Sequence, residues 1–313
     1  MTVVAEKRVG RPAIEADVIS RDVKVPADDA RPLAATLYEL SAGGEGPITA
    51  IAAGAGIQRR YYGRFAAYLA GHGRPTLTFD YRDIGGSRAG SLKDSKVRMR
   101  DWCILDVPGV LAWMAREYPG RPIHWVGHSM GGFATGLAHN NHLVARQLNI
   151  ATLNGYWGRM AVPERYRVRI LMGMLGVPIA RTLGYLPGFL MGGEDMPGPA
   201  FVEWAGWCMT PDFLFGDATL AERSNFARYR GPVRFAQIED DVWGTPAAVE
   251  AMARNFRTSI DNSTWRIRSS DAGGAKIGHH GFFRDQFSDT LWPSALAWLA
   301  GASADKPARS PLS

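Results

Sequence analysis

The chain has 313 residues, of which 46% are hydrophobic and 21% charged, and its formal net charge is +6. This length allows one sizeable α/β domain with an insertion, and the composition is ordinary for a soluble globular protein. The 36 Lys and Arg residues are scattered rather than gathered in a block. That scatter disfavours nucleic acid as a partner and indicates a solvated basic surface instead.

The two cysteines, Cys103 and Cys208, fit neither a disulfide framework nor a metal-ligand spacing. The first ten residues mix charges and contain no apolar segment typical of a signal peptide. Nor does the chain contain an apolar run long enough for a transmembrane helix. Together these features predict a protein of a reducing compartment, the cytoplasm.

The first half of the chain alternates between short apolar strands and amphipathic helices. We expect loose ends at residues 1–12 and from Ser303 onward. Two early strands precede the alternation, and one long helix contains Pro108. The expected strands are Ala16–Val25, Leu33–Leu40, Pro47–Ala53, Thr76–Phe79, Ile123–Val126 and Leu148–Leu153, and the expected helices are Arg59–Ala70, Val97–Tyr118 and Gly131–Asn140.

The alternation stops after residue 154 and resumes near residue 230. The segment between is rich in Met, Trp, Tyr, Phe, Gly and Pro. The pattern predicts the α/β class, with a mostly parallel sheet and helices on both faces. Residues 1–154 and 230–313 would form this core, and residues 155–229 a mainly helical insertion. The resumed elements are the strands Pro232–Ile238 and Ser263–Ile267 and the helices Ala247–Phe256 and Asp285–Leu299.

One glycine-rich turn points to a nucleophile. Gly127, Ser129 and Gly131 form a G-x-S-x-G pattern between an expected strand and an expected helix, which is the context this motif requires. So tight a reversal forces its central residue into strained backbone and admits only small residues two positions away. The hydroxyl of Ser129 would then project from the carboxyl edge of the sheet, beside a helix N-terminus that stabilises a developing oxyanion.

Four segments, in order, resemble the α/β-hydrolase superfamily across about Leu33 to Leu299. They are the elbow, residues 52–56, the D-x-R-G-x-G-x-S-like loop of residues 80–87, and an acid followed by a histidine near the C-terminus. The likeness is to uncharacterised bacterial-type esterase and aminopeptidase-like members. It implies a Ser-acid-His triad in that chain order, and it implies that residues 155–229, after the sixth strand, form a lid. In the 80–87 loop, Asp83 stands where the family usually has Gly, and we assign no chemistry there.

The resemblance places the acid at Asp241, with Asp240 as the alternative, because both follow an expected strand. Two features depart from the family pattern here, namely Ile238 in place of Gly and a Pro246 that comes one residue late. The base is expected at His279, directly after Gly278, with His280 as the alternative. The other five histidines precede the acid and are interpreted as structural: His72, His124, His128, His139 and His142.

Backbone N–H groups should complete the site. The resemblance assigns the oxyanion donors to Met130, after the nucleophile, and Ala55, in the loop after the third strand. No metal or organic cofactor is expected, since adjacent histidines do not readily chelate one ion and no third ligand accompanies them. The insertion contributes aromatic residues to its own core or to an apolar pocket: Tyr156, Trp157, Tyr185, Phe189, Phe201, Trp204, Trp207 and Phe213.

The sequence therefore predicts a serine hydrolase that cleaves a small carboxylic ester with an apolar portion through an acyl-enzyme. Acyl transfer with the same triad, an amide or peptide substrate, and a non-catalytic ligand-binding role stay open. A small molecule is the expected partner, and the sequence leaves the physiological substrate and the oligomeric state undetermined.

Overall fold

Eight strands form one sheet in the order β1-β2-β4-β3-β5-β6-β9-β10. They belong to a computed structural model that describes residues 17–301, so the expected loose ends, 1–12 and 303 onward, lie outside the described residues. β1 and β2 form an antiparallel hairpin and β2 pairs antiparallel with β4, whereas every pairing from β4 to β10 is parallel. The strands are β1 (Val18–Pro26), β2 (Pro32–Leu40), β3 (Ile48–Ala52), β4 (Thr76–Phe79), β5 (Ile123–His128), β6 (Val144–Ile150), β9 (Val233–Ile238) and β10 (Asn262–Ile267).

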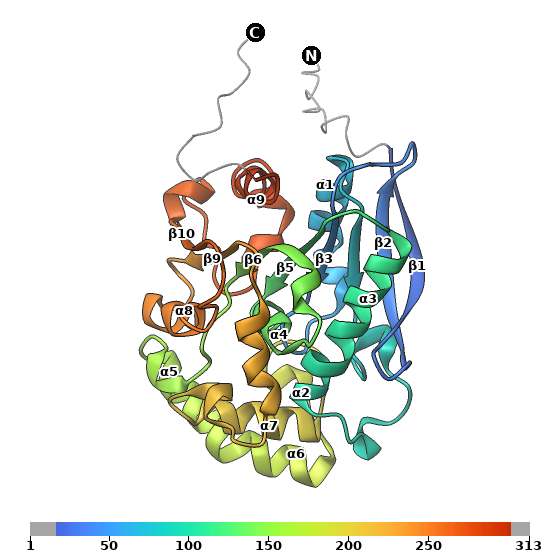
Figure 1. The fold of residues 1–313 in the computed structure, drawn as a ribbon. Coiled ribbons are helices and arrows are strands. Elements are labelled where there is room, and N and C mark those ends of the chain that lie inside the picture. The colour runs from blue at the N-terminus through green and yellow to red at the C-terminus, as the bar shows by residue number, and fades with distance from the viewer. Residues whose placement is uncertain (1–16, 302–313) are drawn as a thin grey trace, which may run out of the picture.

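Helices cover both faces of this sheet (Figure 1). α1 and α9 share one face, where the rings of Phe65 and Trp292 lie 5.2 Å apart, and α3 and α4 pack together on the other. β3 and β5 are buried along their whole length, as expected of central strands covered on both sides. The predicted α/β class with a mostly parallel sheet is therefore confirmed. The core helices are α1 (Gly63–Gly71), α2 (Met99–Asp101), α3 (Val107–Glu117), α4 (Met130–Leu137), α8 (Pro246–Ala253) and α9 (Trp292–Leu299).

The long helix expected across Pro108 accommodates the proline by a local change of winding. α2 continues through a π-helical segment, Trp102–Asp106, into α3, where Pro108 lies in the first turn. A proline has no N–H to donate and its ring interferes with a regular α-helical turn, and the change to π-helical winding lies directly before Pro108. Pro293 likewise lies in the first turn of α9, so the helix expected to begin at Asp285 begins at Trp292.

Residues 155–229 lie between β6 and β9, and their helices, within residues 164–208, lie at the lower end of the view in Figure 1. Their longest helical stretch runs over residues 164–183, with a π-helical middle, Leu171–Gly176. A small antiparallel hairpin of β7 and β8 was not expected from the sequence. The elements are α5 (Glu164–Ile170), α6 (Val177–Leu183), β7 (Tyr185–Leu186), β8 (Met196–Pro197) and α7 (Gly198–Cys208). We call residues 155–229 the insertion.

Candidate active site

The turn between β5 and α4 holds Ser129 in strained backbone. Ser129 has φ +50° and ψ −114°, a region that L-residues rarely adopt. The flanking glycines are required by space. A Cβ on Gly127 would lie 2.3 Å from the Cα of Gly132, and a Cβ on Gly131 would lie 2.3 Å from the carbonyl oxygen of Ala52. The steric argument made from the sequence therefore holds in the structure.

Ser129, His279 and Asp241 form a continuous hydrogen-bonded chain. The His279 Nε2 lies 3.0 Å from the Ser129 Oγ, and the His279 Nδ1 lies 2.8 Å from the Asp241 Oδ2. Asp241 is buried, and the Trp243 N–H donates to its other oxygen at 2.9 Å. Burial alone would raise the pKa of Asp241, but the adjacent His279 and these hydrogen bonds outweigh it, so the pKa of Asp241 is lowered. The carboxylate therefore stays ionised beside the imidazole.

The two alternative residues contact different groups. The Asp240 carboxylate accepts hydrogen bonds from the backbone N–H groups of Ile277 and Gly278, at 3.0 and 2.8 Å. It thus braces the loop that carries His279. The ring of His280 lies edge-on to that of His279, with centroids 4.9 Å apart. The sequence left these pairs of neighbours open, and the structure brings Asp241 and His279, not Asp240 and His280, into line with Ser129.

His128, interpreted from the sequence as structural, links the loops of the site to one another. Its Nε2 lies 2.9 Å from the carbonyl oxygen of His279, and its Nδ1 lies 2.7 Å from the Tyr62 hydroxyl. That hydroxyl accepts a hydrogen bond from the Gly54 N–H at 2.9 Å. Tyr62 and His128 are fully buried, and burial together with the neighbouring histidines lowers the pKa of His128 well below its ordinary value. The neutral ring can then donate from Nε2 and accept at Nδ1.

The position of His128, directly before Ser129, is the one signal by which the sequence could have identified this link. A residue at the end of the nucleophile's strand necessarily lies at the same sheet edge as the neighbouring loops. Tyr62 offered no such signal, because it lies in the short 3₁₀ turn before α1.

Two backbone N–H groups of the predicted oxyanion site have no hydrogen-bond partner within residues 17–301. Within residues 17–301, neither the Ala55 nor the Met130 N–H donates a hydrogen bond. The start of α4 packs directly on the loop after β3, since a Cβ on Gly131 would meet the carbonyl oxygens of both Ala52 and Ala53. Backbone N–H groups away from water normally find partners, so donors left unpaired in these two loops are available to an incoming oxyanion.

The insertion contacts both sides of this site. On one side the Glu194 N–H donates to the Gly56 carbonyl oxygen at 2.7 Å, next to Ala55. On the other, the Trp243 ring lies between His279 and Trp204 of α7, with centroid distances of 5.7 and 6.2 Å. The Trp243 Nε1 also donates to Glu164 of α5 at 2.6 Å. Trp243 is thus the residue through which α5 and α7 reach the imidazole.

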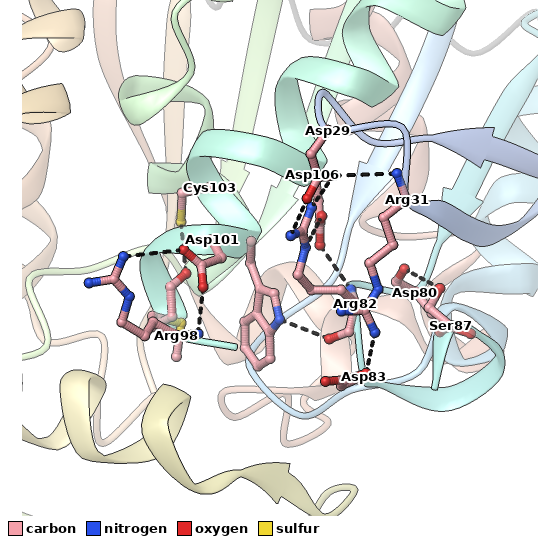
Figure 2. Close-up of polar contacts among 12 residues, drawn as sticks. Asp29, Arg31, Asp80, Arg82, Asp83, Ser87, Arg98, Asp101, Cys103 and Asp106 are labelled. Atoms are coloured by element: carbon pink, nitrogen blue, oxygen red, sulfur yellow. Dashed lines mark hydrogen bonds and ion pairs between the residues drawn. The ribbon is translucent and has the colours of Figure 1, made fainter. Parts of the chain in front are cut away.

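The Asp80–Ser87 loop is a structural brace, as Figure 2 shows. The Arg82 Nε donates to the buried Asp106 at 2.6 Å, and the Arg82 Nη1 and Nη2 each donate to Asp29 at 2.9 Å. Asp83, at the position where the family usually has Gly, adopts φ +61° and pairs with Arg31. An open cavity of about 620 Å³ beside this loop is lined mainly by charged and polar residues and does not include Ser129, Asp241 or His279.

Other site types find no support in residues 17–301. Across this range, no group of three or more His, Cys, Asp or Glu side chains could hold a metal ion. In the same range, no helix is both long and apolar enough to cross a membrane.

Comparisons with known proteins bear on the fold. The family model described as "alpha/beta hydrolase fold" matches residues 48–155, from the start of β3 to five residues beyond β6. No curated protein matches the chain.

Several solved esterases share the fold. An esterase from Thermogutta terrifontis is 16% identical with a TM-score of 0.54, and the match covers 90% of this chain and 98% of that one. One from Pyrococcus furiosus is 16% identical with a TM-score of 0.56, covering 95% and 94%. One from Exiguobacterium antarcticum is 13% identical with a TM-score of 0.56, covering 90% and 100%. At these identities the likeness establishes the fold.

Proposed function

We propose that this protein, a member of the α/β-hydrolase superfamily, is a serine hydrolase whose triad is Ser129, Asp241 and His279. The observation that carries the proposal is the hydrogen-bonded chain from Ser129 through His279 to Asp241, with the serine held in strained backbone. A structural serine has no need of that strain, and strained residues cluster at sites where the strain serves the chemistry.

The chemistry is a two-step acyl transfer to water. His279 removes the Ser129 proton as the hydroxyl oxygen attacks a carbonyl carbon, and Asp241 stabilises the imidazolium that results. The Ala55 and Met130 N–H groups bind the oxyanion of the tetrahedral intermediate. His279 then returns the proton to the leaving group, and an acyl-enzyme remains. Water, deprotonated by the same histidine, attacks that ester and releases the acid and the free serine.

The substrate we propose is a small carboxylic ester with an apolar portion, bound under the insertion as a lid. The esterases that share the fold support ester chemistry. The aromatic contacts from α7 through Trp243 to His279 support an apolar neighbour for the scissile bond. A cytoplasmic location and a core of residues 1–154 and 230–313 belong to the same proposal.

Labelling with a fluorophosphonate probe tests the nucleophile. Wild-type protein should be labelled, Ser129→Ala should not, and Ser20→Ala, an exposed control, should be labelled like the wild type. Well-folded wild type that stays unlabelled would contradict the proposal and favour a ligand-binding role.

A panel of p-nitrophenyl esters of increasing acyl length then tests the substrate class. We expect kcat/KM to change at least ten-fold with acyl length, and indifference to length would argue against an apolar pocket. Product analysis with and without added alcohol or thiol separates hydrolysis from acyl transfer.

A further inference from the structure

Large apolar side chains gather on the outside of the insertion. Of the ten large hydrophobic residues that are exposed within residues 17–301, seven lie between Val162 and Phe189. Phe189 is 84% exposed and Met174 is 66% exposed. Single exposed apolar residues are ordinary, whereas a concentration of them on one segment marks an interaction surface. The seven are Val162, Tyr166, Ile170, Met174, Leu175, Leu183 and Phe189.

Helical geometry places several of these residues in one row. Tyr166, Ile170 and Met174 follow one another at intervals of four along the helical stretch of residues 164–183, so they share its outer side. The opposite side, with Val168, Met172 and other residues, is buried against the protein. We call Tyr166, Ile170, Met174 and Leu175 the outer ridge. This stretch lies at the lower end of the view in Figure 1 and protrudes from the molecule.

The same segment is strongly cationic. Residues 157–193 contain five arginines and one acidic residue, Glu164. Arg167 pairs with Glu164, but no carboxylate within residues 17–301 lies within 4.0 Å of the other four. Arg169 and Arg181 are exposed. The arginines are Arg159, Arg165, Arg167, Arg169 and Arg181.

We infer that the outer ridge and its arginines dock the protein on the surface of an anionic lipid membrane. Apolar side chains on a helix that lies in the plane of the interface enter the boundary between headgroups and acyl chains, and arginines beside them bind anionic headgroups. Charge complementarity favours this occupant over a second copy of the chain, because a twofold contact would set the arginines beside one outer ridge against those beside the other. A protruding ridge also suits a fluid bilayer, which conforms to it, better than a protein partner, which must supply a matching groove.

Co-flotation with lipid vesicles tests this inference directly and does not depend on catalysis. We expect wild-type protein to float with vesicles of phosphatidylcholine and phosphatidylglycerol in a 3:1 ratio. It should not float with vesicles of pure phosphatidylcholine, and 0.5 M NaCl should weaken its binding to the anionic vesicles by screening the charges. The double variant I170S/M174S should lower the partition coefficient at least ten-fold. Arg169→Gln and Arg181→Gln should each lower it about five-fold.

The matched control is Ile260→Ser, an exposed apolar residue outside the insertion, which should bind vesicles like the wild type. Circular dichroism checks that each variant is folded. Wild-type protein that stays behind with the anionic vesicles would overturn the inference. So would ridge variants that bind as tightly as the wild type. Sedimentation velocity tests the alternative occupant, a second copy of the chain. A wild-type dimer that the I170S/M174S variant abolishes, in a protein that binds no vesicles, would also overturn the inference.

Discussion

The insertion and the floor of the site differ in which kind of side chain is buried and which is exposed. We use "site floor" for Tyr62, His128, Ser129, Asp241 and His279. There, polar groups are buried or half-buried and joined by hydrogen bonds of 2.7–3.0 Å. In the insertion, large apolar groups face outward, up to 84% exposed at Phe189.

Each arrangement costs stability unless something offsets it. Buried polar groups are stable only when every partner is present, so the site floor tolerates few changes. Exposed apolar groups remain without a partner until another surface covers them. Substitutions of these groups in the insertion should therefore cost the isolated protein little stability. Under the two proposals above, the site floor organises the chemistry and the outer side of the insertion binds the membrane.

The largest effect should come from the acid in the site floor. Asp241→Asn should lower kcat by about four orders of magnitude, because the amide fixes the wrong tautomer of His279. Asp240→Asn, its neighbour and matched control, keeps an oxygen to brace residues 277 and 278 and should cost ten-fold or less. Steady-state kinetics on the best ester measures both. A larger loss of kcat in Asp240→Asn than in Asp241→Asn would mean that Asp240, not Asp241, is the acid.

Replacing a glycine by alanine should change the stability of the two regions in opposite directions. Gly131→Ala forces a Cβ to within 2.3 Å of the backbone oxygen of Ala52, and it should lower the free energy of unfolding by more than about 3 kcal/mol. Gly206→Ala, on the exposed side of α7, meets no atom within 4 Å and should stabilise by roughly 0.5–1 kcal/mol. Urea denaturation measures both, and equal losses would mean that the insertion is packed as tightly as the elbow.

Buried neutral histidines should make stability fall in mild acid. Burial and the nearby Arg74 lower the pKa of His124 to about 3, against about 6.5 in an unfolded chain. The unfolded state then binds more protons below pH 6.5. The stabilisation is therefore complete above that pH and is lost as the pH falls towards 3, by about 2 kcal/mol at pH 5. Denaturation at pH 5 and pH 7 should show this loss reduced in His124→Gln and unchanged in His142→Gln, an exposed control.

The smallest effect should come from the hydroxyl that links the loops. Tyr62→Phe removes the partner of the Gly54 N–H and of the His128 Nδ1, and two unpaired buried groups should lower kcat about ten-fold with little change in KM. The matched control is Tyr68→Phe. Tyr68 lies in α1, the helix that follows Tyr62, and its ring is half-buried. The rate of fluorophosphonate labelling gives the same comparison without a known substrate. Equal rates for the two variants would mean that the link does not position the site.

Local sterics explain which parts could be predicted from the sequence. The sheet alternation follows from hydrophobic periodicity, and the elbow follows from the crowding that only Gly127 and Gly131 relieve. The choice between Asp241 and Asp240 depends on which way a turn directs two adjacent carboxylates, and sequence spacing does not resolve that. The link through Tyr62 and His128 joins loops distant in the chain, and the outer ridge depends on which side of a helix faces the protein. Neither relation has a local signature.

The hydrogen bond from His128 to the backbone of His279 joins residues 151 positions apart in the chain. During synthesis at 5–20 residues per second, His128 is therefore added to the chain roughly 8 to 30 seconds before His279. During that interval His128, which is fully buried in the folded protein, lies next to Ser129 in a chain that does not yet contain His279. Under the proposed function, a nascent chain cannot hydrolyse an ester before Asp241 and His279 have been added, so the onset of activity would report a late stage of synthesis and folding.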